Sequence, residues 1–155
     1  MPKSTYLISD SLKSLESQIE KVVLGKNIPA LSDKTKELIV KISPWLTLVS
    51  LLLMLPLILA AFGISAMILP FSYLGGLQSG LGYTLGMIFF FGMLILEIMA
   101  LPGLFKRESR AWRLIFYSVL LSLVQQLLDF NLGGLVIGGA ISLYILFQVK
   151  SKYTK

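Results

Sequence analysis

Two long apolar segments, about residues 80–101 and 111–129, are separated by a short loop rich in lysine and arginine. Each segment has about the 20 residues that an α-helix needs to cross the hydrocarbon core of a bilayer. A basic loop between two spans stays on the cytoplasmic side of the membrane. The pattern therefore predicts a transmembrane hairpin whose bend lies in the cytoplasm.

Two further apolar segments flank this hairpin, about residues 45–69 before it and 134–149 after it. Trp45, at the start of the first segment, stands where an aromatic belt meets the lipid headgroups. Pro56 lies inside the same segment and predicts a kink or an early end. Together the four segments predict an all-α integral membrane protein, with a four-helix transmembrane domain over residues 44–149.

Positive charge sets the expected sides of the membrane. Of the 14 lysine and arginine residues, seven lie in residues 1–43, four in residues 106–113 and three in the tail, residues 150–155. Four spans with both termini inside place all of them on the cytoplasmic face of the plasma (inner) membrane. Because each group flanks an apolar segment, the net charge of +6 predicts contact with the lipid bilayer and no binding of nucleic acid.

Composition excludes several kinds of chemistry. The chain is 55% hydrophobic and 14% charged, with a mean hydropathy of +0.81, whereas soluble domains are about 25% charged. It contains no cysteine and no histidine. This excludes disulfides, thiol catalysis, haem held by imidazole and the usual zinc sites. No serine has a credible base beside it, so we expect neither a cofactor nor enzymatic activity.

Residues 1–43 predict two helices on the cytoplasmic side. Apolar side chains recur at helical spacing in the first helix: Ile8, Leu12, Leu15, Ile19 and Val22. This amphipathic helix is expected to lie on the inner leaflet or under the bundle, or else to form a coiled-coil seam with a second copy or a partner. Residues 25–29 break it, and Ser32 or Asp33 can cap a second helix over residues 34–43.

Glu97 is the only acidic residue well inside a predicted span. A charge there costs about 2.5–3.5 kcal/mol at the membrane centre, which makes such a residue a functional candidate. If the bend centres near Phe105, Glu97 faces Arg113 and forms an ion pair with it; Arg110 is the alternative partner. The other interpretations are a proton or cation site, and a side chain that reaches out to water.

A polar stripe follows one face of the third predicted span: Ser118, Ser122, Gln125 and Asp129. Such a stripe avoids lipid, so it predicts hydrogen bonds to other helices or, alternatively, one side of a polar path or binding cleft. We expect it to face the fourth span, with Ser122 opposite Ser142 and Gln125 opposite Gly138 and Gly139. Leu123, on the opposite arc, is then expected to face lipid.

Small residues at four-residue spacing predict where helix backbones approach closely. The fourth span has Gly134, Gly138 and Ser142, and the second span has Gly82 and Gly86. With no motif for a reaction, we predict an accessory or structural subunit that binds other membrane proteins or itself. The alternatives are a small transporter or channel that uses Glu97 and the polar stripe and, more weakly, a protein that permeabilises the membrane.

Overall fold

The computed structural model describes residues 3–25 and 28–154 and is helical throughout, without a strand in these residues. The helices are α1 (Lys3–Val23), α2 (Asp33–Ser72), α3 (Leu77–Lys106), α4 (Ser109–Leu128) and α5 (Gly139–Val149). Short turns complete the chain: η1 (Tyr73–Gly75) between α2 and α3, the π-helical η2 (Gly134–Gly138) before α5, and η3 (Lys150–Lys152) after it.

Three segments are long and apolar enough to cross a membrane, judged by length and composition over the described residues: Gly80–Lys106, Ser109–Leu128 and Gly134–Lys152. An all-helical chain with three such helices fits an integral membrane protein, as the sequence predicts. Large apolar side chains also stand exposed along the described part of α2, including Leu53 and Met67.

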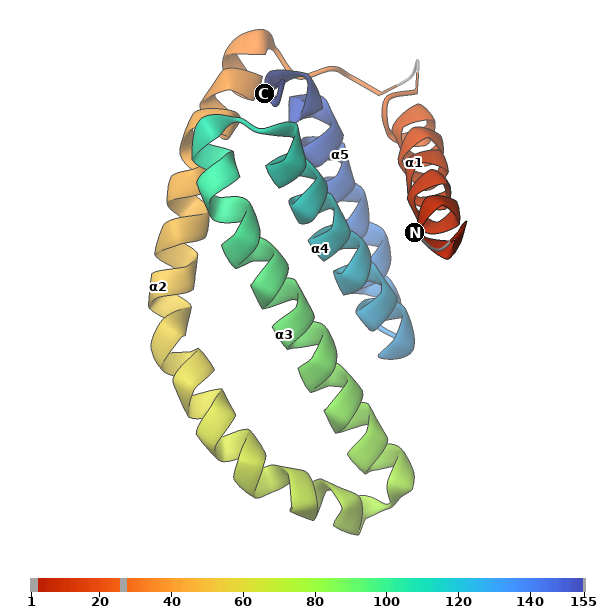
Figure 1. Cartoon of the computed structure of the whole chain (residues 1–155), viewed down its shortest axis with the longest axis vertical. Coiled ribbons are helices and arrows are strands. Elements are labelled where there is room, and N and C mark those ends of the chain that lie inside the picture. The colour runs from red at the N-terminus through yellow and green to blue at the C-terminus, as the bar shows by residue number, and fades with distance from the viewer. Residues whose placement is uncertain (1–2, 26–27, 155) are drawn as a thin grey trace.

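The helices form two antiparallel hairpins that lie side by side. Figure 1 shows α2 and α3 as a long hairpin joined at η1, with the shorter hairpin of α4 and α5 beside α3. We call the end that holds the start of α2, the α3–α4 loop and the C-terminal tail the charged end, and the opposite end the distal end. Along its middle, α2 bows away from α3 (Figure 1).

The predicted helix over residues 34–43 and the first predicted span form one helix, because α2 runs through Pro44 without interruption. Proline has no backbone N–H, so Pro44 would leave the carbonyl of Val40 without its helical partner. The Ser43 hydroxyl donates to that carbonyl at 3.3 Å and so repairs the ladder. Pro56 also lies inside α2, and its missing bond accounts for curvature instead of the predicted early end.

The start of α2 agrees with the sequence. The Ser32 hydroxyl accepts a hydrogen bond from the backbone N–H of Thr35 at 3.2 Å, which is the predicted N-cap. Of the predicted break before it, Gly25 and Ile28 are described and joined by a backbone hydrogen bond of 2.9 Å. Lys26 and Asn27 lie outside the described residues.

The bend between α3 and α4 falls later than predicted. The second span was expected to stop at Pro102, but α3 continues to Lys106. Arg107 takes the left-handed conformation with φ of 58°, and the N–H of Glu108 bonds the carbonyl of Gly103 at 2.8 Å. This is a Schellman motif, which ends helices by satisfying their last carbonyls. The bend therefore centres between Arg107 and Glu108, after Phe105.

Most buried side chains gather at the charged end. They come from all of α2 to α5 and from the tail: Val40, Ala100, Leu104, Ala111, Trp112, Phe116, Leu146, Phe147, Val149 and Tyr153. The rings of Trp112 and Phe116 stack with centroids 5.5 Å apart, and Phe147 packs edge-on against both. This aromatic core fixes the four helices at one end and leaves the distal end sparsely packed.

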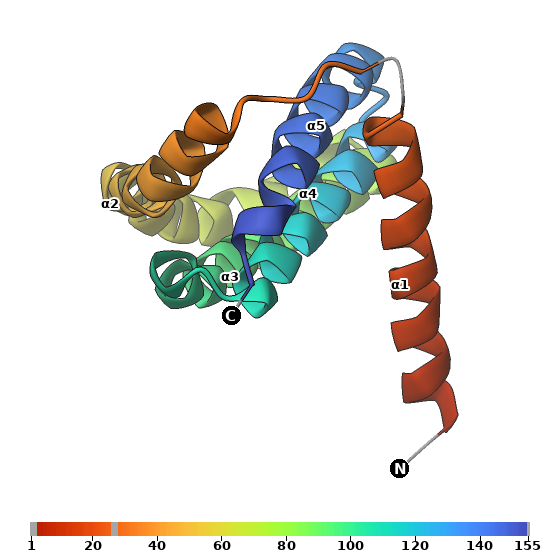
Figure 2. The same cartoon turned by 90° about the horizontal axis from the view of Figure 1, so that it is seen from above.

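Helix α1 lies across the bundle axis beside α5, as Figure 2 shows by viewing the bundle from above. The residues of the predicted apolar stripe differ in how far they are buried. Leu12 and Ile19 are partly buried, whereas Leu15 is 46% exposed and Val22 is 75% exposed. The side chain of Ile8 lies outside the described part of the chain. The stripe thus packs along one edge only and leaves the other edge open.

Candidate functional site

Glu97 contacts Ser118, and Arg113 lies elsewhere. The later bend shifts the register of the hairpin, so that residue 97 stands opposite residue 118. The Ser118 hydroxyl donates to Oε1 of Glu97 at 3.4 Å. Arg113 is exposed on α4, and no ion pair joins it, or the alternative partner Arg110, to Glu97 within the described residues.

The same extension of α3 places Glu97 farther from the helix end than predicted. Glu97 lies nine residues before Lys106, which is roughly 14 Å of helical rise. The candidate span Gly80–Lys106 has 27 residues, and its rise of roughly 40 Å exceeds the roughly 30 Å hydrocarbon core of a bilayer. The interpretation of Glu97 as a side chain that reaches out to water stays a prediction.

Glu97 lines a cleft of about 490 Å³ between α2 and α3. We call it the Glu97 cleft. Its lining residues are Phe90, Met93, Leu94 and Glu97 on α3, Leu46, Thr47, Ser50 and Leu51 on α2, and Ile115 on α4. A second cleft of about 260 Å³ lies between α2 and the α4–α5 hairpin and includes Ser43 and Ser142. Both clefts are lined by Thr47 and Ile115, so they adjoin.

The hydroxyl groups of α2 were missed by the sequence analysis. Ser43, Thr47 and Ser50 follow one another at spacings of four and three, so they share one helix face. That face lines the two clefts. The Thr47 hydroxyl donates to the Ser43 carbonyl at 3.0 Å, which leaves its oxygen as an acceptor toward the cleft. The spacing of these hydroxyl groups is the signal in the sequence that could have predicted this polar face of α2.

The polar stripe of α4 does not meet α5 as predicted. Ser118 faces α3, and Ser122 accepts a 3.4 Å hydrogen bond from Gln126 of its own helix. Gln125 is half-buried and Asp129 is exposed. Instead, Leu123 faces α5: its Cδ2 lies 2.5 Å from where a Cβ on Gly139 would stand. The expectation that Leu123 faces lipid is therefore wrong, and α4 is rotated relative to the prediction.

The glycines that make close helix contacts differ from those predicted. Gly82, Gly86 and Gly138 have no described heavy atom within 4 Å of an added Cβ. Ser142 lines the second cleft, and a Cβ on Gly134 would collide with Gln126 and Asn131 beside the distal turn. Among the described residues, close packing against α4 occurs at Gly92 on Leu121, Gly103 on Ala111 and Gly139 on Leu123, and Gly80 packs on the Tyr73 ring.

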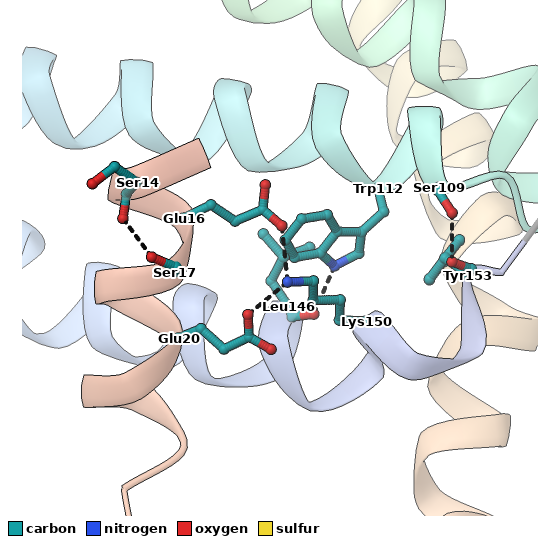
Figure 3. A network of polar contacts seen from close by, with 9 residues as sticks. All are labelled: Ser14, Glu16, Ser17, Glu20, Ser109, Trp112, Leu146, Lys150 and Tyr153. Carbon is teal, nitrogen blue, oxygen red and sulfur yellow. Dashed lines mark hydrogen bonds and ion pairs between the residues drawn. The ribbon is translucent and has the colours of Figure 1, made fainter. Parts of the chain in front are cut away.

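A second polar cluster, also missed, surrounds Lys150 (Figure 3). Its Nζ forms ion pairs with Glu16 at 2.8 Å and with Glu20 at 2.6 Å, both on α1. The same Nζ lies 5.1 Å from the ring centroid of Trp112, within range of a cation–π interaction. Glu16 and Glu20 are four residues apart on one helix face, and this spacing could have predicted a shared cation.

Hydrogen bonds also hold the segment that follows α1. The Tyr144 hydroxyl donates to the Pro29 carbonyl at 2.6 Å, and the N–H of Leu31 donates to the buried Gln148 side chain at 3.2 Å. These hydrogen bonds hold the linker after α1 on α5, and the ion pairs of Lys150 hold α1 itself there.

The C-terminal tail is fixed at Tyr153. Its carbonyl accepts a 2.8 Å bond from the Ser109 hydroxyl (Figure 3), and its own hydroxyl shares a 3.1 Å bond with Ser43. Burial raises the pKa of the Tyr153 hydroxyl, against the lowering effects of the bond to Ser43 and of the charge on Arg107. The tail thus joins α2 and α4 at the charged end.

Comparison with known proteins gives no relative: no family model matches the chain, and no curated protein and no solved structure matches it.

Proposed function

We propose that this is a four-span protein of the plasma (inner) membrane, with both termini in the cytoplasm. Beyond the three candidate spans described above, the fourth proposed span is the apolar part of α2, about residues 45–69. Its course supports this: α2 is 40 residues long and starts at the charged end, where Glu37 pairs with Arg107 at 2.5 Å and Asp33 with Lys152 at 3.5 Å. A helix of that length, antiparallel to α3, has roughly 60 Å of rise, ample to cross the bilayer.

Cysteine labelling tests this topology cleanly, because the chain has no native cysteine. An impermeant maleimide added to intact cells should label Asp129→Cys, which is exposed beside the distal turn. Lys106→Cys and Lys152→Cys should react only after permeabilisation. Labelling of residue 106 from outside would overturn the proposed orientation.

The protein then acts, without catalysis, as an accessory subunit that binds another membrane protein or a second copy of itself. One observation carries this proposal. Gly82 and Gly86 lie one turn apart on α3, and an added Cβ at either glycine meets no described atom within 4 Å. Such glycines let a second helix approach closely, and no described atom of this chain fills the space beside them.

Photo-crosslinking in native membranes tests partner binding. A benzophenone amino acid at Gly86 should give a discrete crosslinked product, either a dimer or an adduct with one membrane protein. The matched control is Val124, which is 47% exposed on α4 and should give only diffuse lipid products. Equal crosslinking at both positions, or none at Gly86, would count against the accessory role.

A small transporter or channel is the second candidate, and the place of Glu97 favours it. A carboxylate roughly 14 Å from the helix end, beside a cleft with hydroxyl groups on its far wall, has the composition of an ion or proton site. Purified protein in liposomes should then show flux that Glu97→Gln abolishes. Flux that persists in this variant would remove Glu97 from the mechanism.

A further inference from the structure

Glu97 places a carboxyl group inside the candidate membrane span of α3, and no cation pairs with it in the described part of the chain. Its described polar contact is the hydrogen bond from Ser118, which orients the carboxylate without neutralising it. An intramembrane carboxylate of this kind is costly unless a cation or a proton accompanies it. The arrangement therefore favours an occupant that brings positive charge.

The Glu97 cleft has the size and lining of a small-molecule site. Its volume of about 490 Å³ lies within the roughly 300–1,000 Å³ of known ligand pockets. Phe90, Met93 and Leu94 make most of one wall apolar, and the ring of Phe90 can attract a cation through its face.

We propose that the Glu97 cleft binds a lipophilic cation, meaning a molecule with one positive charge and bulky apolar groups. The carboxylate of Glu97 pairs with the charge, while Phe90 and Met93 contact the apolar groups. An anion would be repelled, and a small hydrated cation would leave the apolar wall without a partner. Binding of the cation depends on the membrane placement of α3 but not on Gly82 or Gly86. An experiment can therefore refute the cation site without refuting the accessory role, and the reverse.

Equilibrium binding of tetraphenylphosphonium to the purified full-length protein in detergent tests the proposal. The wild type should bind it saturably, and Glu97→Gln should lose about tenfold or more in affinity, because an ion pair in a poorly hydrated cleft is lost. Asp129→Asn removes the same charge at an exposed position and should bind normally. Lowering the pH should weaken binding to the wild type, since a protonated carboxylate no longer attracts a cation.

Two further measurements keep the test decisive. Met93→Trp fills the cleft without touching the charge and should also reduce binding; circular dichroism establishes that each variant is folded. Triphenylphosphine oxide, a neutral molecule with three of the four phenyl groups of the probe, should compete poorly. Equal binding by wild type and Glu97→Gln, or equal competition by the neutral molecule, overturns the proposal. A crosslinked second copy that covers Glu97 and blocks the probe would overturn it as well.

Discussion

Gly138 and Gly139 are neighbours whose surroundings differ sharply, which makes them a matched pair for testing how α4 packs on α5. Both have helical backbone, with φ of −63° and −62°. A Cβ on Gly138 meets open space, whereas a Cβ on Gly139 stands 2.5 Å from Leu123 Cδ2, inside the normal contact distance. We predict that Gly139→Leu destabilises the bundle and that Gly138→Leu does not.

The expected difference in stability between the two variants follows from the contact of residue 139 with Leu123. Both substitutions remove a helical glycine and gain about 0.8–1 kcal/mol of helix propensity, so this gain cancels in their difference. Forcing a leucine against Leu123 costs about 1–3 kcal/mol, as in other overpacked cores. With about 2–4 °C per kcal/mol for a chain of this size, Gly139→Leu should melt about 2–12 °C below Gly138→Leu.

Tryptophan fluorescence during heating in detergent measures this difference. Trp112 is buried, and its indole N–H donates to the Leu146 carbonyl of α5 at 2.8 Å, so it reports on the same interface. Trp45, the other tryptophan, is replaced by phenylalanine throughout to isolate the signal. Adding Leu123→Ala to Gly139→Leu should restore part of the lost stability, because it vacates the space. Equal melting of the two glycine variants, or strictly additive losses, would refute the packing of Leu123 on Gly139.

Two other predictions concern the charged end. Lys150→Met should release α1, because Glu16 and Glu20 then lose their shared cation, and amide hydrogen exchange in α1 should rise. The control is Lys152→Met, since the pair of Lys152 with Asp33 is 3.5 Å long and more exposed. This control should leave the exchange rate of α1 unchanged. Tyr153 has a raised pKa, so its folded form favours the neutral hydroxyl: its contribution is present below about pH 10 and is lost as the pH rises through the pKa of the folded state. Tyr153→Phe should therefore flatten the alkaline loss of stability seen in urea titrations of the wild type, and identical profiles would contradict this assignment.

Helix identity and order could be predicted from the sequence because the signals are strong and local. Long apolar runs bounded by charge predict membrane helices, and the three spans found over the described residues match predicted ones. The cap at Ser32 was equally local, since a hydroxyl before a helical pattern needs only the next turn to act.

Which helix faces meet could not be predicted the same way. A period of 3.6 residues tells which side chains share a face, but not which neighbour that face contacts. Ser118 was placed correctly on a polar face, yet that face turns to α3 and leaves Leu123 for α5. The partner of Glu97 depended on the bend, and moving the bend from Phe105 to between Arg107 and Glu108 exchanged Arg113 for Ser118.

The position of Glu97 relative to the buried core bears on both proposals. One turn toward the charged end, Ala100 is fully buried, and Phe116, on α4 near Ser118, is buried as well. A carboxylate at Ala100 would be sealed in the core and would need a permanent counter-ion. A carboxylate at Met93, one turn toward the distal end, would lose the hydrogen bond from Ser118. Glu97 thus stands at the boundary where the packed end holds it in place and the open cleft admits an exchangeable cation.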